Sequence, residues 1–586
     1  MQDTIISQML DSLRDCGLPQ QQSFQLCLLI LAWAKMSAKK AIPEELRITS
    51  TLLDDPVKTR KAFELFGASE DVGEELRIPE GIRPTFELAM RLSDTGVLQQ
   101  LDVADAICAL DSRYLVDAAL PPEVATLLVD LAGIRSGDSV YTPWDNGGQL
   151  AARAVRTASK VFLETPLSWP IAFFVSLLSD KPFDVTFTDP ITKPSAVEGG
   201  KPRKFDVAVS FPTLGLKYDP DVVRQDWFDR FPERTTSGSV LAIRHLLSQA
   251  NRRVVVAVPN SLLFSVGAEL SLREDLVEKG LIEAVIAMPA GLLSYSKSPF
   301  AILVLDPVGK HNEIRFVNAD VPRFREASSK PKFRLTELAE LIQLTFDPSY
   351  SEYARTAFAE EVMGRGAQLQ VNRYVLQESS KRYLWYFENT AWGLLGDMVD
   401  TVRPMPTTPN RKGAIEVREI GAVDLPPYGY ILEPGRTVYV DREIAAKNKE
   451  QFLQPLDIVL IVKGSVGKLG IVPPQVQSSG QGGWVAGQSA IVLRRNSEVG
   501  IDSRALAIQL RSPLGQELLS TIVSGAAIPL IQLRELMHLE ILDMDEDATR
   551  QAIDALEEET RLQREIDRLK QAQSEVTSGL WGPFDV

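Results

Sequence analysis

The stretch that decides the fold runs from residue 140 to residue 150 and reads Val-Tyr-Thr-Pro-Trp-Asp-Asn-Gly-Gly-Gln-Leu. Apolar residues lead into a glycine turn, and a helical pattern begins at Ala151, so the stretch predicts a strand, a turn and a helix. A glycine turn at a helix N-terminus lets a ligand approach backbone N–H groups, as in nucleotide-binding α/β folds. The signal is weak alone, because turns of this kind are common connections.

Short apolar runs continue on the C-terminal side of this turn, separated by amphipathic segments. They cover residues 161–163, 207–209, 254–258, 284–288 and 301–305. The alternation predicts a mostly parallel α/β sheet. Two acids end such runs: Glu164, which could accept hydrogen bonds from ribose hydroxyls, and Asp189. A polar residue at a strand end is the simpler explanation for either acid alone.

The regions before and after these apolar runs have different sequence patterns. Together the patterns predict a multidomain α/β protein. Residues 1–118 have a helical pattern, with Ile5, Met9 and Leu13 at near-helical spacing. We expect a helical N-terminal domain at 1–118, an α/β domain at 119–395 and a proline-rich linker at 396–410. A β-rich, glycine-punctuated domain should follow at 411–546, and a long helix with a tail at 547–586.

The C-terminal helix is predicted from a highly charged segment with regularly placed apolar residues. Ile553, Leu556, Leu562, Ile566 and Leu569 are spaced by three, six, four and three, which favours one apolar stripe. Such a stripe needs a partner. We expect an antiparallel pairing with a second copy, and the alternative is that the helix folds back onto its own chain.

Composition limits the class of protein. Of 586 residues, 45% are hydrophobic and 24% charged, which excludes wholesale disorder. Lys+Arg 63 against Asp+Glu 78 gives 63 − 78 = −15, so contact with nucleic acid must rely on local basic patches. The cysteines Cys16, Cys27 and Cys108 lack metal-ligand spacing, and the apolar run 26–34 is shorter than the ~20 residues that span a bilayer. A cytoplasmic protein without a metal is expected, and we assign no chemistry to its three histidines.

One local basic segment stands out at residues 322–334. It carries Arg323, Arg325, Lys330, Lys332 and Arg334 against Glu326, a balance of +5 − 1 = +4. We take Arg323, Arg325, Lys330 and Lys332 as candidate phosphate contacts. From charge alone, a solvated loop is the simpler explanation.

Taken in order, these pieces resemble the adenine-N6 DNA methyltransferases (modification subunits) of type I restriction-modification systems. The matching stretches are 120–125, 140–150, 205–215, 253–264 and 287–293. The resemblance implies a Rossmann-like methyltransferase sheet and S-adenosylmethionine as cofactor. The cofactor-binding positions that it implies are Pro122, Thr142, Asn146, Gly147, Gly148, Glu164 and Asp189.

The departures from this family fall on the residues that carry its chemistry. The family has Asn-Pro-Pro-Phe or Tyr where this chain has Phe211, Pro212, Thr213 and Leu214. In the family the Asn accepts a hydrogen bond from the adenine amino group and the aromatic ring stacks on the flipped base. Phe211 offers no acceptor and Leu214 no π-face, and each loss costs roughly 1 to 3 kcal/mol. Methyl transfer is therefore expected to be impaired.

The cofactor turn departs from the family pattern as well. Thr142 replaces the family Asp, and the turn is one residue short with bulky Trp144 and Asp145 inside it. We expect these side chains to crowd the amino-acid part of S-adenosylmethionine, so the sequence leaves cofactor binding open. Whether the chain is an enzyme is open too, because a methyltransferase could tolerate these variants.

The C-terminal third resembles a target-recognition domain of a type I specificity subunit. The matching stretches are 455–460, 462–472, 487–493, 511–516 and 525–530. Such domains read base edges through loops, so Lys463, Lys468 and Gln488 are candidate DNA contacts, with Arg494 and Arg495 beside them.

The function that follows is a sequence-recognising DNA-binding protein of a prokaryotic restriction-modification or phage-defence system with impaired methyl transfer. Its expected partners are double-stranded DNA, restriction, helicase or other defence subunits, and a second copy of the chain. The alternatives are an active adenine-N6 methyltransferase, a scaffold for nuclease or helicase subunits, and a nucleotide-sensing pocket.

Overall fold

The computed structural model describes residues 2–66, 81–107, 120–166, 171–294, 296, 299–328, 333–349, 351–375, 391–409, 413–496, 501–524 and 529–578. The chain divides into two compact units, residues 1–375 (unit 1) and 376–586 (unit 2). Each unit has hydrophobic clusters of its own.

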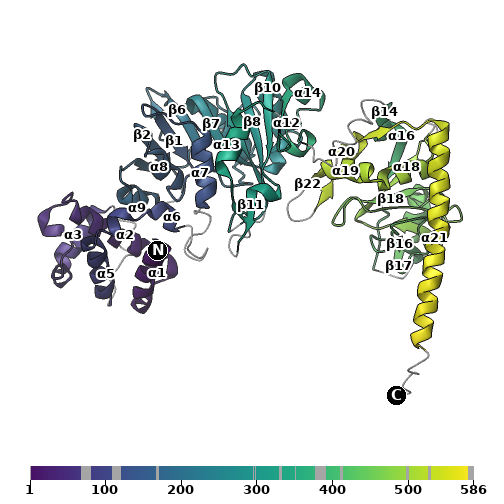
Figure 1. Cartoon of the computed structure of the whole chain (residues 1–586), viewed down its shortest axis with the longest axis horizontal. Helices are drawn as coiled ribbons and strands as arrows, with labels where there is room; N and C mark the ends of the chain where they lie inside the picture. The colour runs from purple at the N-terminus through teal and green to yellow at the C-terminus, as the bar shows by residue number, and fades with distance from the viewer. Residues whose placement is uncertain are drawn as a thin grey trace. The chain divides into compact units, whose positions relative to one another are not determined.

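A nine-stranded sheet forms the centre of unit 1, in the order β13-β10-β8-β9-β7-β6-β1-β2-β3 (Figure 1). Five of its eight neighbouring pairs are parallel, which confirms the predicted mostly parallel sheet. The strands are β1 Ser139–Pro143, β2 Lys160–Glu164, β3 Asp184–Thr186, β6 Phe205–Ser210, β7 Ala250–Pro259, β8 Ile282–Met288, β9 Phe300–Leu305, β10 Glu313–Asn318 and β13 Ala354–Phe358.

The core of unit 1 lies on both faces of this sheet. Along β7, Val254, Val256 and Val258 pack on one face, whereas Val255 and Ala257 pack on the other. A strand buried on both sides reads as a continuous apolar run, which is why the sequence indicated it. The first face is covered by α11 Gly238–Gln249, α12 Ala268–Glu278 and α14 Ala359–Gly364, and the second by α7 Pro122–Leu131, α8 Gln149–Ala154, α9 Ile171–Leu178 and α13 Leu338–Phe346.

The N-terminal region is helical, as predicted, and it packs as part of unit 1. Its helices are α1 Gln2–Ser12, α2 Gln20–Ala38, α3 Pro56–Leu65, α5 Arg83–Asp94 and α6 Val103–Ala106. The apolar run in α2 is buried in the same cluster as α7, α8 and α9, so it is a core helix. None of the helices in the described ranges is long and apolar enough to cross a membrane.

Smaller elements connect these layers. They are β4 Val197–Glu198, β5 Lys201–Pro202, α10 Pro220–Arg224, β11 Arg325–Ala327 and β12 Phe333–Leu335. The last two strands belong to the basic segment 322–334 and pair antiparallel, and residues 329–332 lie outside the described ranges.

Unit 2 is rich in β-structure and ends in a long helix, as predicted. A four-stranded sheet, β15-β21-β18-β19, accompanies a three-stranded sheet, β17-β16-β20. The strands are β14 Trp392–Leu394, β15 Val399–Val402, β16 Ala414–Ile420, β17 Arg436–Asp441, β18 Ile458–Ile461, β19 Leu469–Ile471, β20 Trp484–Ala486, β21 Ala490–Arg495, β22 Val523–Ser524, β23 Leu530–Ile531 and β24 Glu540–Leu542. The helices are α16 Leu395–Met398, α17 Arg442–Lys447, α18 Ser503–Arg511, α19 Pro513–Thr521, α20 Leu533–Met537 and α21 Glu546–Ser578.

Residues 392–402 belong to unit 2, although we expected them to end the α/β domain and begin a linker. They form β14, α16 and β15, and these strands pair with β24 and β21. Elements of three and four residues are too short to show a helical or strand-like hydrophobic periodicity. The prolines that follow them were therefore the only local signal, and they predicted a linker.

The predicted single apolar stripe on α21 is wrong, because the apolar residues lie on two faces. Leu556 is fully buried in the core of unit 2, whereas Leu562, Ile566 and Leu569 are 46%, 43% and 54% exposed. At about 100° per residue, the six-residue step from Leu556 to Leu562 separates their side chains by about 120° around the helix. The first half of α21 therefore folds back onto its own unit, and the second half carries a separate exposed face.

Candidate functional site

The carboxyl ends of β1, β2 and β6 lie side by side, because these strands are parallel neighbours. The turn 144–148 follows β1, Glu164 ends β2, and Phe211 follows β6. The structure thus brings together three parts of the candidate site that are far apart in the sequence. Asp189 comes shortly after β3, which pairs with β2.

The turn after β1 is closed by its own acid. The Asp145 side chain is buried, and its carboxylate accepts hydrogen bonds from the N–H groups of Gln149 at 2.9 Å and Ala151 at 2.8 Å. Trp144 adopts a left-handed φ of 59° and its N–H donates to the Glu164 carbonyl at 2.8 Å. The first N–H groups of α8 are therefore already bound to a carboxylate of this chain.

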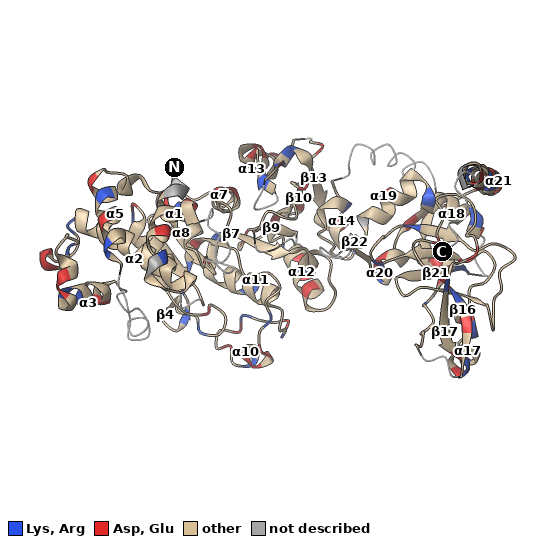
Figure 2. Ribbon diagram, turned by 90° about the horizontal axis from the view of Figure 1, so that it is seen from below, with Lys and Arg blue, Asp and Glu red and all other residues tan. Residues whose placement is uncertain are grey.

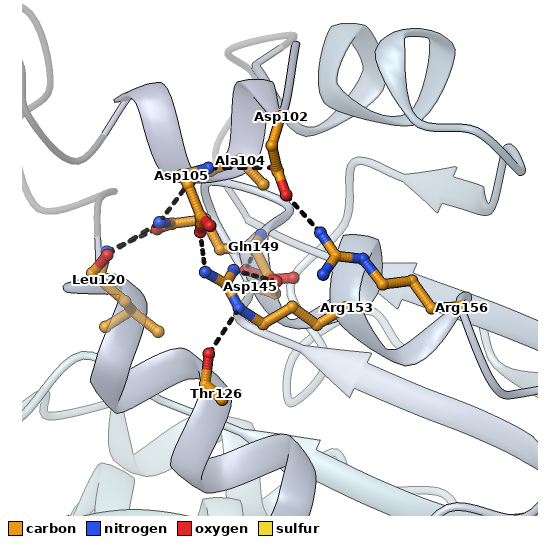
Figure 3. Close-up of polar contacts among 9 residues, drawn as sticks. All are labelled: Asp102, Ala104, Asp105, Leu120, Thr126, Asp145, Gln149, Arg153 and Arg156. Atoms are coloured by element: carbon orange, nitrogen blue, oxygen red, sulfur yellow. Dashed lines mark hydrogen bonds and ion pairs between the residues drawn. The ribbon is translucent and has the colours of Figure 1, made fainter. Parts of the chain in front are cut away.

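Gln149 fastens this turn to the segment before α7, as Figure 3 shows. Its Nε2 donates to the carbonyls of Ala104 at 2.9 Å and Leu120 at 2.8 Å, and its Oε1 accepts from the Leu120 N–H at 2.5 Å. Arg153, which like Gln149 belongs to α8, pairs with Asp105 of α6. Pro122, one of the candidate cofactor positions, is the first residue of α7.

Glu164 is fully buried, and both of its carboxylate oxygens are engaged. Oε1 accepts from the Thr188 hydroxyl at 2.6 Å and from Ser195, through its N–H at 2.5 Å and its hydroxyl at 2.8 Å. Oε2 accepts from the Tyr141 hydroxyl at 2.5 Å. Both carboxylate oxygens of Glu164 thus accept hydrogen bonds from groups of the same chain.

A one-directional chain of hydrogen bonds leads to Glu164 through the core. Arg230 can only donate, so its bond to His245 Nδ1 at 2.8 Å makes that nitrogen the acceptor. His245 Nε2 then donates to the Tyr141 hydroxyl at 3.0 Å, and Tyr141 donates to Glu164. Burial and the neighbouring Arg230 hold the pKa of His245 well below its ordinary value, in keeping with a neutral ring. No spacing in the sequence signalled that Tyr141, His245 and Arg230 meet.

The residues that follow β6 are mostly core side chains. Phe211 is 5% exposed and packs edge-on against Phe300, with ring centroids 5.3 Å apart. Leu214 is partly buried against the same cluster, Pro212 is buried and Thr213 is exposed. The Thr142 hydroxyl is buried, and among the described residues it has no hydrogen-bond partner.

The remaining cofactor candidates are held by local contacts. Asn146 Oδ1 accepts from the Thr165 hydroxyl at 2.6 Å. Asp189 accepts from the N–H groups of Ile191 and Thr192 and from the Tyr218 hydroxyl at 3.0 Å. Gly147 and Gly148 are buried, and a Cβ on Gly148 would come within 3.1 Å of the Ala172 Cα atom of α9.

These contacts test whether the candidate residues fit S-adenosylmethionine. Its ribose hydroxyls need an acceptor such as Glu164, and its amino-acid part needs the N–H groups at the start of α8. Both sets of groups already bind other parts of the chain. A bound S-adenosylmethionine would therefore compete with these internal hydrogen bonds. No group of three His, Cys, Asp or Glu side chains in the described ranges could hold a metal ion.

The three arginines of the basic segment 322–334 lie close to acids of unit 1. Arg323 pairs with Glu340 at 2.8 Å, and Arg325 pairs with Asp320 at 2.5 Å. Arg334 lies 3.8 Å from Glu123. Lys330 and Lys332 lie outside the described residues.

The candidate DNA contacts of unit 2 lie on its surface. Lys463, Lys468 and Gln488 are exposed, although Lys468 Nζ donates to the Ala422 carbonyl at 2.7 Å and Gln488 Nε2 to the Met405 carbonyl at 3.0 Å. Arg494 instead binds both oxygens of the buried Asp457, at 2.9 and 2.7 Å. Figure 2 shows Lys and Arg interspersed with Asp and Glu along the elements in view.

The buried turn acid makes the stability of unit 1 depend on pH. Burial raises the pKa of Asp145 to about 7, against the opposing effect of the N–H donors of α8. Because the folded pKa exceeds the unfolded value of about 3.9, folding takes up a proton between about pH 4 and pH 7. The contribution of Asp145 to the free energy of unfolding should therefore fall as pH rises through this window, by up to about 1.4 kcal/mol per pH unit.

Urea unfolding of Asp145→Asn between pH 5 and pH 8 measures this effect. The variant should show a flatter pH dependence than the wild-type chain. Asp184→Asn, at an exposed acid on β3, is the matched control and should keep the wild-type slope. Equal slopes in all three proteins would contradict the assignment to Asp145.

Comparisons with known proteins agree with this architecture. Residues 176–382 match the N-6 DNA Methylase family, a range that includes β6 and Phe211 to Leu214. The methylase subunit of the type I restriction enzyme MjaVII from Methanocaldococcus jannaschii is 22% identical over 292 residues, covering 44% of this chain and 49% of that protein. The chain thus spans about half the length of this curated relative.

A solved structure shares the fold. The methyltransferase subunit of a type I restriction-modification system from Streptococcus thermophilus superposes with a TM-score of 0.53 at 15% identity, covering 64% of this chain and 99% of that subunit. At this identity the likeness concerns the fold alone. Together with the matched range, it identifies residues 176–382 as a domain of the N-6 DNA methylase family, carried on the fold of a type I methyltransferase subunit.

Proposed function

We propose that the chain is a sequence-recognising DNA-binding protein of a prokaryotic restriction-modification or phage-defence system in which methyl transfer is impaired. The observation that carries this proposal is the placement of Phe211. It stands where the family has the Asn that accepts from the adenine amino group, and its ring is packed against Phe300 in the core. A buried apolar ring offers the base neither a hydrogen bond nor an open stacking surface.

The cofactor side supports the same proposal. Asp145 and Gln149 lie in and directly after the turn that the resemblance assigns to S-adenosylmethionine, and Glu164 is its expected ribose acceptor. The side chains of all three form hydrogen bonds within the chain. A ligand that needs them must break several buried hydrogen bonds, each worth about 0.5 to 1.5 kcal/mol net. We therefore propose that S-adenosylmethionine binds weakly or not at all.

DNA recognition is assigned to unit 2 as a target-recognition domain at residues 411–546. Its β-rich architecture and the exposed Lys463, Lys468 and Gln488 support this assignment. Restriction, helicase or other defence subunits would supply the reaction on DNA, and a second copy of the chain would supply a second recognition domain. A scaffold that binds such subunits without touching DNA is the competing function.

Fluorescence anisotropy with labelled duplexes over a salt series tests DNA binding. Contacts to phosphates should make affinity fall steeply as salt rises. Lys330→Glu with Lys332→Glu should weaken binding to all sequences alike, whereas Lys463→Ala or Gln488→Ala should change the preference among sequences.

The matched control is Lys449→Glu, a single charge reversal in unit 2 at a lysine that is not among the candidate contacts. It should leave sequence preference unchanged. Unchanged affinity in both variant sets, or no binding at low salt, would refute DNA recognition and favour the scaffold.

A further inference from the structure

The second half of α21 presents an apolar face that unit 2 does not cover. Leu562, Ile566, Leu569 and Val576 are 46%, 43%, 54% and 73% exposed, at spacings of four, three and seven residues. In the heptad notation abcdefg, Leu562, Leu569 and Val576 take d positions and Ile566 takes an a position. The exposed Gln573 occupies the remaining a position.

The first half of the helix is fixed to unit 2 by polar contacts, and Glu559, one heptad before Ile566, makes two of them. The Tyr430 hydroxyl donates to Glu557 at 2.7 Å, the Gly429 N–H donates to Glu559 at 3.1 Å, and Arg511 pairs with Glu559 at 3.3 Å. Figure 1 shows the last turns of α21 running beyond the strands of unit 2. Most helical stability in proteins comes from packing of an apolar face, so a partner that covers this seam would stabilise the end of the helix.

We propose that two copies of the chain pair through this seam as a parallel, in-register two-stranded coiled coil. The inference rests on the proposed dimer but not on DNA binding, and it replaces the antiparallel pairing expected from the sequence. Ile at a with Leu at d is the combination that favours two parallel strands. In register, Leu562, Ile566, Leu569 and Val576 each meet their own counterpart.

The polar layer supports the same register. In a parallel pair Gln573 faces Gln573 of the second copy, and two amides can hydrogen-bond across the seam. In an antiparallel overlap centred between residues 566 and 569, Gln573 would instead face Leu562. A buried amide against leucine leaves its donors and acceptor unpaired.

The flanking charges favour parallel strands as well. Glu565 takes a g position and Lys570 the following e position, which a parallel pair brings together across the interface. Glu565 also binds Arg568 of its own helix at 2.8 Å, where both side chains are exposed. An antiparallel pair that overlaps the whole helix would bring Glu565 near Glu558 and bury Leu562 against Glu559. Like charges would then face each other at both symmetry-related ends.

Cysteine cross-linking in the full chain tests the orientation. Gln573→Cys and, in a separate variant, Leu569→Cys should each form a disulfide-linked dimer that doubles the mass of the 64.8 kDa chain on a non-reducing gel. Peptide mapping should find 573 joined to 573, or 569 joined to 569. The wild-type chain under the same oxidation is the control for its own cysteines.

A mixture of Ala548→Cys and Gln573→Cys chains, tagged differently, tests the antiparallel pairing. A link between 548 and 573, or a dimer in light scattering that links at neither 569 nor 573, would overturn the parallel orientation. Ile566→Glu should convert the dimer to a monomer with the thermal melting of unit 2 unchanged, since this residue lies outside the core clusters. A wild-type monomer would overturn the inference and the dimer, whereas loss of DNA binding alone would touch only the proposed function.

Discussion

In a tritiated-methyl assay on mixed DNA, we expect the wild-type chain to give only background signal, and we expect the same of a chain that carries both Phe211→Asn and Leu214→Phe. The two substitutions restore the acceptor and the aromatic ring of the family motif. They leave Asp145, Gln149 and Glu164 hydrogen-bonded within the chain. The two base-site losses, at roughly 1 to 3 kcal/mol each, together correspond to about 30- to 3 × 10⁴-fold in rate. If the cofactor does not bind, as proposed, their repair restores no activity.

The same variants should report the structural role of Phe211. Replacing this buried ring by Asn removes its packing against Phe300, a loss comparable with the roughly 3 to 5 kcal/mol of a Phe→Ala change in a core. Thermal melting is therefore measured beside activity. Thr213→Ala, in the same loop with an exposed side chain, is the control and should melt as the wild-type chain does.

Isothermal titration with S-adenosylmethionine separates the two defects. No heat and no methylation in either protein would place the block in the cofactor turn and at Glu164. Methylation well above background in the wild-type chain would refute impaired transfer. Recovery in the double variant would show that cofactor binds and that the base pocket alone is defective.

Arg494→Ala is expected to lower the free energy of unfolding of unit 2 by about 3 kcal/mol. Its guanidinium binds both oxygens of Asp457, whose side chain is 2% exposed, and also donates to the carbonyls of Glu450 and Phe452. Truncation leaves a buried carboxylate with the Gln454 N–H, at 2.7 Å, as its remaining donor in the described structure. Urea unfolding followed by tryptophan fluorescence measures the loss.

Arg495→Ala is the matched control, because this side chain is the next along β21 and is exposed. It should cost less than about 1 kcal/mol. If Arg494→Ala is equally mild but weakens DNA binding, Arg494 is a DNA contact and the structural assignment is wrong.

The sheet could be predicted because a strand that is buried on both faces has a continuous run of apolar residues in the sequence. Val254 to Val258 is such a run, and it lies in β7. The stripe on α21 was misread because Leu556 and Leu562 share one spacing pattern but not one face. A list of spacings does not say which face the rest of the domain covers.

The candidate site was predicted only in outline. The resemblance identified the positions of Glu164 and Phe211, but not what those side chains contact. The hydrogen bonds from Tyr141 and from Ser195 join residues 23 and 31 apart, and His245 lies 104 residues from Tyr141. Such contacts depend on the strand order of the finished sheet, which no local pattern encodes. The sequence likewise does not indicate that Arg494 forms an ion pair with the buried Asp457.

The hydrogen-bond chain from Arg230 through His245 and Tyr141 to Glu164 also has an evolutionary consequence. Each donor in this series is oriented by the group before it. If Glu164 turned to bind a ribose, the other buried groups would lose hydrogen-bond partners. Every such group costs about 1 to 3 kcal/mol, within a total stability of about 5 to 15 kcal/mol for a domain. A substitution that frees Glu164 for another ligand is thus expected to destabilise the fold before it gains any affinity for that ligand. An evolutionary route to a new ligand at Glu164 therefore needs more than one substitution.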